Sequence, residues 1–281
     1  MKFNICCSEK TFESKEWMVV YDEFHRDLKI ASFSGKEVTM PSMFLEYWYY
    51  LWDKDSTKIG KEFCSPKNLR LTSRIWEYVH TLACIYYNLS EIRGKKILSL
   101  GAGLESPLWT LSRWGAEVYA SDMYEEKGYW HPEWVPFLKT NPEVFSPYNE
   151  KYPVNFVNLN LQKPKKWTNI GIYDVIYSIS SIEHVYEHLE SKIGLLIRIV
   201  KHLKSSGIFS FTTELITSFE NKRRKDFYTR EELEKIIYVL ADHGLSLADI
   251  PLWETATEQE VPSDGCSGQK HTAISLTFLK R

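Results

Sequence analysis

The sequence lacks an excess of charge of either sign. Among its 281 residues, 35 are lysine or arginine and 37 are aspartate or glutamate, which leaves a formal net charge of −2. A polyanion such as DNA or RNA is held mainly by an excess of basic side chains. The near-balance of charge therefore argues against a nucleic acid as the substrate.

Long apolar runs are also missing. No segment approaches the roughly 20 apolar residues that a membrane-spanning helix needs, and the opening MKFNICCSEK is too polar for a secretory signal. We therefore expect no membrane span and a cytoplasmic location.

Cysteine is scarce, and its few positions are scattered. The five cysteines contain no CxxC pair, so the sequence suggests neither a disulfide framework nor a zinc site. We expect reduced thiols. A chain of this length can bury one substantial core, which favours a single body with an extension over two independent domains.

The segment that organises the chain runs from Lys95 to Tyr124. Its pattern predicts a buried strand ending at Leu100, a turn at Gly101 and Gly103, a helix, and a second strand from Glu117 to Ser121. Ser106 as N-cap, Pro107 at the first helical position and Gly115 beyond the last turn would bound the helix.

Asp122 follows the second strand directly. In a doubly wound sheet, ligands bind beyond the carboxyl ends of the strands, so Gly101, Gly103 and Asp122 would face one crevice. The carboxylate could then accept hydrogen bonds from a ribose diol. These features fit either a dinucleotide or S-adenosylmethionine (SAM), although Ser106 stands where the dinucleotide pattern GxGxxG has its third glycine.

Two downstream segments favour SAM. They are YDVIYSISSIEHV, from Tyr173 to Val185, and HLKSSGIFSFTTE, from His202 to Glu214. Together with LSLGAG and YASD, they resemble the ordered motifs of class I SAM-dependent methyltransferases, from roughly Lys95 to Ala241. The resemblance is closest to a broad group with an SSIEH-like fourth strand end, many of whose members act in bacterial saccharide biosynthesis.

The resemblance implies an α/β, Rossmann-like, seven-stranded and mostly parallel sheet with an antiparallel last strand. It implies SAM as cofactor, S-adenosylhomocysteine (SAH) as product, and O-methylation of a small molecule or saccharide precursor. We expect cofactor contacts from Leu100, Gly101, Ala102, Gly103, Glu105, Asp122, Met123, Asn160, Leu161, Ser178 and Ile179.

The N-terminal third, residues 1–93, is expected to be a mostly helical extension that packs on the core and covers the cofactor. A helix is predicted from Pro66 to Ile92, an aromatic-rich helix from about Ser42 to Asp53, and a short strand from Glu16 to Tyr21. Ordinary core packing is the alternative role for the aromatic helix.

Residues 94–281 form the expected methyltransferase domain, with an aromatic-rich insertion at 124–153. A connection of this length is uncommon unless it is functional. It leaves the sheet beside Asp122, and aromatic faces suit stacking on a sugar ring. We expect Tyr129, Trp130, His131 and Trp134 to contact the acceptor, with a structural insertion as the alternative.

After a third strand from Val154 to Leu161 and a fourth from Tyr173 to Ser178, the apolar spacing predicts one helix from Ser181 to Leu203. His184 and His188 would lie one turn apart on it. This spacing is compatible with a metal, but no third ligand is evident in the sequence, so we expect no metal.

A fifth strand, from Gly207 to Thr213, would place Glu214 at the mouth of the cleft. The basic run at 222–225 could meet a phosphate of the acceptor, or it could be a solvated loop. Thr229 and Glu232 predict a capping box that opens a helix to about Asp242. Two last strands are expected at Leu245–Ile250 and His271–Leu279.

The methyl group of a sulfonium is already activated, so the chemistry demands mainly an aligned acceptor and, for a hydroxyl, a base. His184 is the better base candidate, because histidine exchanges protons readily near neutral pH. Glu183 would assist, and Glu214 would bind the acceptor. The alternative is that His184 only shapes the wall.

Two residues depart from the commonest family pattern. Ser99 stands where an acid usually precedes the first glycine, and Glu105 stands at the third glycine position. Glu105 could instead supply the carboxylate that meets the amino group of the cofactor. The departures leave open a non-catalytic SAM-binding partner protein, and a dinucleotide-dependent oxidoreductase is the further alternative.

Overall fold

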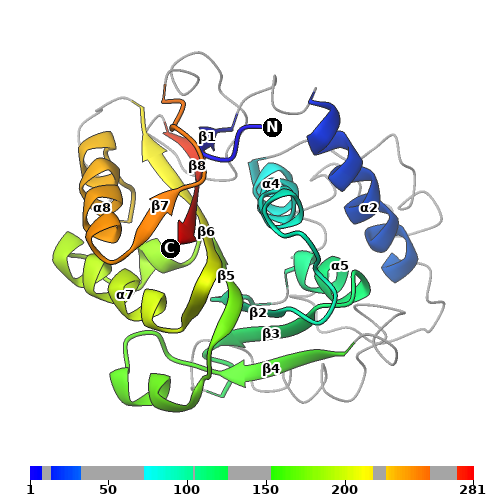
Figure 1. The fold of residues 1–281 in the computed structure, drawn as a ribbon, viewed down its shortest axis with the longest axis horizontal. Helices are drawn as coiled ribbons and strands as arrows, with labels where there is room; N and C mark the ends of the chain where they lie inside the picture. The colour runs from blue at the N-terminus through cyan, green and yellow to red at the C-terminus, as the bar shows by residue number, and fades with distance from the viewer. Residues whose placement is uncertain (8–13, 33–72, 104, 126–152, 218–225, 254–270) are drawn as a thin grey trace, which may run out of the picture.

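The computed structural model of the chain describes residues 1–7, 14–32, 73–103, 105–125, 153–217, 226–253 and 271–281. Within them, an eight-stranded sheet has helices on both faces (Figure 1). Its strands follow the order β1-β8-β6-β5-β2-β3-β4, and β7 pairs with β8 outside that path. This arrangement is an α/β, Rossmann-like fold.

The strands are β1 (Ile5–Cys6), β2 (Lys96–Leu100), β3 (Glu117–Asp122), β4 (Val154–Asn158), β5 (Tyr173–Ile179), β6 (Leu203–Ile216), β7 (Leu245–Leu247) and β8 (His271–Lys280). The described helices are α2 (Lys15–Ser32), α4 (Ser73–Asn88), α5 (Pro107–Arg113), α7 (Leu189–Lys201) and α8 (Arg230–Asp242), with the 3₁₀ helices η4 (Pro164–Asn169) and η5 (Ile182–His184). None of the described helices is both long enough and apolar enough to cross a membrane.

The centre of the sheet is parallel, and its last strand is not. Strands β4, β3, β2, β5 and β6 run parallel to one another. Strand β8 pairs antiparallel with β6 on one side and with β7 on the other. The expected antiparallel last strand is therefore confirmed. Strand β1, which also pairs antiparallel with β8, is an eighth strand that the sequence patterns did not predict.

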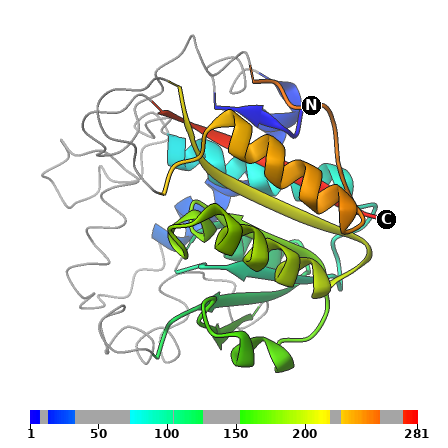
Figure 2. The same ribbon diagram turned by 90° about the vertical axis from the view of Figure 1, so that its left-hand side faces the viewer.

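Successive residues of the central strands point into two separate cores. Ile97 and Tyr177 pack in the cluster that includes α2, α4 and α5, whereas Leu98 and Ile176 pack with α7 and α8. Figure 2 shows α7 and α8 covering the face of the sheet turned toward the viewer. Burial on both faces explains why these strands read as continuous apolar runs.

The strand predicted from Glu16 to Tyr21 is wrong, because these residues belong to α2. Trp17, Val20 and Phe24 recur at helical spacing and are all buried, while Val19 is exposed. A short apolar run is compatible with the periodicity of a strand or of a helix, and these residues form a helix. In the described part of the helix predicted over 66–92, α4 spans Ser73–Asn88. The helix predicted at about 42–53 lies outside the described residues.

The helix predicted from Ser181 to Leu203 is shorter than expected. Ile182–His184 form η5 alone, and α7 begins only at Leu189, because His188 has an extended backbone (φ −93°, ψ 137°) at the N-cap. His184 and His188 therefore do not lie one turn apart on a helix. Ile182 and Glu183 are both buried where η5 follows the end of β5.

Smaller corrections concern element ends. Ser106 has helical backbone angles (φ −64°, ψ −29°) and its side chain makes no capping hydrogen bond, since an N-cap side chain reaches the helix from an extended backbone. Gly115 does adopt the predicted left-handed conformation (φ +93°). The capping box of Thr229 and Glu232 is confirmed at the start of α8. Strand β4 ends at Asn158, three residues before the predicted end.

Candidate functional site

The glycine turn after β2 leaves no room for a side chain at its first position. Gly101 has φ +65°, and a Cβ atom there would lie 1.7 Å from the Oγ atom of Ser181. The turn is fastened to the end of β3, because the Ala102 amide donates a hydrogen bond of 2.9 Å to the Ser121 carbonyl oxygen. Bare backbone therefore lies at the carboxyl end of β2, beside that of β5.

Asp122 holds the same turn through its side chain. Its Oδ2 atom accepts a hydrogen bond of 2.9 Å from the Gly103 amide, and its Oδ1 atom accepts one of 2.6 Å from the Met123 amide. Tyr124 supports the turn from the other direction, since its hydroxyl donates to the Gly103 carbonyl oxygen at 2.7 Å. The Gly103 backbone is therefore held at both its amide and its carbonyl group.

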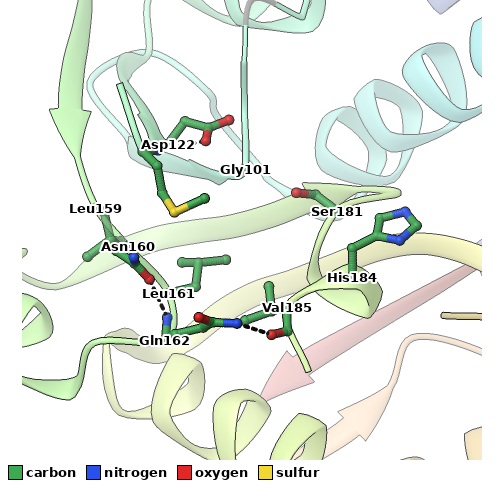
Figure 3. Close-up of a pocket in the computed structure, with 10 residues that line it drawn as sticks. Gly101, Asp122, Leu159, Asn160, Leu161, Gln162, Ser181, His184 and Val185 are labelled. Atoms are coloured by element: carbon green, nitrogen blue, oxygen red, sulfur yellow. Dashed lines mark hydrogen bonds between the residues drawn. The ribbon is translucent and has the colours of Figure 1, made fainter. Parts of the chain in front are cut away.

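A cavity of about 140 Å³ opens beyond the carboxyl ends of β2, β3, β4 and β5. Figure 3 shows Gly101 and Asp122 at the top of the view, Leu159 to Gln162 on one side, and Ser181, His184 and Val185 on the other. The lining residues are Gly101, Asp122, Met123, Leu159, Asn160, Leu161, Gln162, Ser181, His184 and Val185.

Five of the predicted cofactor residues meet at this cavity, namely Gly101, Asp122, Met123, Asn160 and Leu161. The remaining six do not line it: Leu100, Ala102, Gly103, Glu105, Ser178 and Ile179. The Ser178 hydroxyl is buried and donates at 3.0 Å to the Leu100 carbonyl oxygen, so it joins β5 to β2. These six residues brace the turn and the strand ends behind the cavity.

Gln162, Ser181, Leu159 and Val185 line the cavity without having been predicted. The Gln162 amide nitrogen of the backbone donates to Asn160 Oδ1 at 2.9 Å, and its side chain donates to the Val185 carbonyl oxygen at 2.5 Å (Figure 3). Gln162 therefore ties the two sides of the cavity together. Its position directly after Leu161 is the signal that could have found it.

Ser99 and Glu105, the two departures from the family pattern, contact each other. The Ser99 hydroxyl donates to Glu105 Oε1 at 2.5 Å, and both side chains are buried. Burial raises the pKa of Glu105 to about 8, although the hydrogen bond from Ser99 acts in the opposite direction. The carboxyl group missing at position 99 is thus supplied beside it by Glu105.

A second polar group lies on the His184 side of the cavity. One ligand atom from each of Glu183, His184 and Glu214 lies within 4.8 Å of the other two. His184 Nε2 is 3.6 Å from Glu183 Oε1, and His184 Nδ1 is 3.4 Å from Asp226 Oδ2. Glu183 is fully buried, and this burial, with the nearby charge of Glu214, raises its pKa well above the ordinary value.

Glu77 of α4 was missed by the sequence patterns, which treated α4 only as a packing helix. Its buried carboxylate accepts hydrogen bonds from the hydroxyls of Thr212, at 2.9 Å, and Ser180. Arg74 forms an ion pair with it at 3.0 Å. Burial raises the pKa of Glu77, while Arg74 lowers it. A carboxylate on the apolar face of an amphipathic helix was the available signal.

The four residues expected to contact the acceptor, Tyr129, Trp130, His131 and Trp134, lie outside the described residues, as does the basic run at 222–225. Tyr124, at the start of the insertion, is described and packs edge-on against Phe156 with ring centroids 5.5 Å apart. The insertion thus leaves β3 beside the glycine turn.

No protein-family model and no curated protein sequence matches the chain. Solved structures with the same fold include magnesium protoporphyrin IX methyltransferase from Synechocystis with bound SAM, which is 15% identical with a TM-score of 0.50 over 95% of this chain and 98% of that chain. The same enzyme with bound SAH is 14% identical, with a TM-score of 0.50 over 95% and 100% of the two chains.

A TehB-like SAM-dependent methyltransferase from Corynebacterium glutamicum is 15% identical, with a TM-score of 0.48 over 85% of this chain and 97% of that chain. At these identities, the likeness to the Synechocystis structures shows the fold alone.

Proposed function

We propose that the chain is a SAM-dependent methyltransferase that acts on a small molecule. The observation that carries the proposal is the cavity at the carboxyl ends of four parallel strands, lined by Gly101, Asp122 and Asn160. The bound SAM and SAH of the Synechocystis structures, which share the fold, support the choice of cofactor.

The residues present fit this cofactor. Gly101, which packs against Ser181, presents bare backbone to the cavity, and a cofactor could approach that backbone closely. Asp122 lines the cavity at the end of β3, where its carboxylate could accept hydrogen bonds from ribose hydroxyls, and Asn160 and Leu161 would border the adenine. Glu105 stays a candidate partner for the amino group of the cofactor, because a cation favours the charged form of a carboxyl group.

Bound SAM would supply a methyl group that its sulfonium has already activated. The chain must then orient an acceptor and receive its proton. His184 lines the cavity and is the residue placed to take that proton, with Glu183 beside it at 3.6 Å. Glu214 would hold the acceptor. A base beside the activated methyl group supports O-methylation, because a hydroxyl acceptor must lose its proton.

Two alternatives are less well supported. In a non-catalytic partner protein, the space beside Glu183 could be closed, whereas here the cavity reaches His184. A dinucleotide-dependent oxidoreductase is disfavoured by the antiparallel insertion of β8 between β6 and β7 and by Ser106 at the third glycine position of GxGxxG.

The finer parts of the proposal are a saccharide or saccharide-precursor acceptor, a cytoplasmic location, and an extension at residues 1–93 that covers the cofactor of the domain at 94–281. Tyr129, Trp130, His131 and Trp134 would form one wall of the acceptor site. These parts follow from the sequence resemblance and from the position of the insertion after Asp122.

Screening nucleotide sugars and glycan precursors for SAH formation tests the activity. Trp130→Ala should weaken use of the acceptor strongly and leave SAH affinity nearly unchanged, whereas Asp122→Ala should mainly weaken SAH binding. Equal losses of both properties in the Trp130→Ala variant would contradict the acceptor wall.

A further inference from the structure

Glu183 carries a fully buried carboxyl group. Neither of its oxygen atoms has a hydrogen-bond partner among the described residues. Glu214 Oε2 is likewise without a partner in that part of the chain. Buried carboxylates are normally hydrogen-bonded, paired with a cation or bound to a metal.

Glu77 shows how the same region satisfies a buried acid. Its carboxylate has Arg74 as a cationic partner, together with the hydroxyls of Ser180 and Thr212. Glu183 instead faces another acid, Glu214, and the imidazole of His184. Among the described residues, no lysine or arginine forms an ion pair with Glu183 or Glu214, so nothing in that part of the chain balances the two converging acids.

His184 is oriented as a ligand. Its Nε2 atom faces Glu183 at 3.6 Å, and its Nδ1 atom faces the Asp226 carboxylate at 3.4 Å. Metal-binding histidines commonly donate their other ring N–H to a carboxylate, which fixes the tautomer and the ring orientation. Asp226 is placed to do this. The His184 side chain is 46% exposed, so an ion can reach the group from solvent.

We propose that Glu183, His184 and Glu214 bind one divalent transition-metal ion beside the cofactor cavity. Ligand atoms lie roughly 2.0–2.2 Å from zinc, so atoms now within 4.8 Å of one another must close by about an ångström. Flexible glutamate side chains can supply that movement. The site would replace the expectation of no metal, which considered only His184 with His188.

The donor set selects the class of ion. One imidazole nitrogen with two carboxylates suits Zn²⁺, Mn²⁺ or Fe²⁺, whereas Mg²⁺ and Ca²⁺ prefer oxygen ligands throughout. Three protein ligands leave a coordination position open. With the ion bound, His184 and Glu214 would act as ligands and not as the base and the acceptor-binding residue proposed above. The role of the ion, unlike its binding, rests on the proposed function: an acceptor hydroxyl in the open position would lose its proton more readily.

The test is titration of the full chain with Co²⁺, after treatment with a chelator, followed by calorimetry and by visible absorption. One saturable site is expected. His184→Gln and Glu214→Gln should each weaken binding by tenfold or more, and Asp226→Asn by about tenfold, as is typical for the partner of a ligand. His188→Gln is the matched control and should bind like the wild type.

Circular dichroism identifies any variant that fails to fold. If the two ligand variants do not fold, Asp226→Asn still tests the site, because it changes no ligand. Absence of a saturable site in the wild type would overturn the proposal and would indicate a proton shared by the two glutamates. Affinity undiminished in folded His184→Gln or Glu214→Gln would also overturn it. SAH titration of the same samples reports separately on the proposed function.

Discussion

At the scale of single residues, Gly101 carries two requirements that can be separated. Its φ of +65° favours glycine, and the Ser181 hydroxyl occupies the place that a Cβ atom would take. Gly94 has a similar φ of +71°, but no atom lies within 4 Å of the position that a Cβ would take there. The two glycines therefore make a matched pair.

Gly101→Ala should destabilise the chain more than Gly94→Ala does. Both variants incur the left-handed cost of roughly 1–2 kcal/mol, but only the first also displaces Ser181 from the cavity wall. Urea denaturation measures the difference, and SAH titration should show loss of affinity for Gly101→Ala alone. Equal stability and equal affinity of the two variants would contradict the packing described for the turn.

Glu105 makes stability depend on pH. Its pKa in the folded chain is about 8, against an ordinary value of 4.5, so the folded chain holds a proton that the unfolded chain releases between these values. The resulting stabilisation is complete below pH 4.5 and is lost as pH rises toward 8.

The free energy of unfolding of the wild type, measured relative to Glu105→Gln, should therefore fall across this range. The limiting slope is about 1.4 kcal/mol per pH unit. Denaturant titrations of both proteins between about pH 5 and 9, at intervals of roughly one unit, give the comparison. Glu117→Gln, which changes a half-exposed strand residue, is the control. A difference that stays constant with pH would refute the buried, protonated state of Glu105.

Residue-level features were predictable from the sequence where they depend on near neighbours in the chain. Gly101 and Asp122 fall directly after consecutive strands, so parallel pairing alone brings them together. Ser181, Gln162 and Glu77 reach the same region only through the packing of β5, the loop after β4, and α4. Their local sequence can at most mark the residue, as the acid on the apolar face of α4 does, but it does not specify the partner that the residue meets.

At the scale of elements, the same distinction separates correct predictions from wrong ones. The capping box of α8 is a local interaction between Thr229 and Glu232, and its prediction is confirmed. The apolar spacing after Ser181 suggested one long helix, yet the extended backbone of His188 separates η5 from α7. The apolar spacing predicts a helix, but it does not predict where the helix begins and ends.

Strand β1 was invisible to sequence patterns because it has only two residues, and the side chain of the preceding Asn4 adds long-range contacts to its pairing with β8. Asn4 Nδ2 donates to Asp249 Oδ1 and to the Asp249 carbonyl oxygen, both at 2.7 Å. Asn4 Oδ1 accepts from the Thr277 amide at 2.6 Å. One buried amide therefore joins the N-terminus to β8 and to the segment after β7.

Asn4→Ala should lower the free energy of unfolding by about 1–3 kcal/mol, the usual cost of leaving buried partners unsatisfied. Asn155→Ala is the control, because exposed Asn155 of β4 donates a single hydrogen bond of 3.1 Å to the Val118 carbonyl oxygen. That change should stay within about 0.5 kcal/mol. Thermal and denaturant unfolding of both variants would show whether β1 is held as described.

At the scale of the whole molecule, the sheet order explains why one cavity gathers residues from distant parts of the chain. Parallel strands β4, β3, β2 and β5 end at the same edge, and their following loops meet there. The class of fold and the antiparallel β8 were predictable from the order of the motifs. The identity of the acceptor was not predictable. It depends on segments that follow the strands, whereas the motifs mark only the strand ends.

The central claim is that this edge binds SAM rather than a dinucleotide. Isothermal titration of the full chain with SAH and, separately, with NAD⁺ tests it most directly. The account predicts one SAH per chain, affinity reduced at least tenfold in Asp122→Ala, and no saturable binding of NAD⁺. Binding of NAD⁺ without binding of SAH would contradict it.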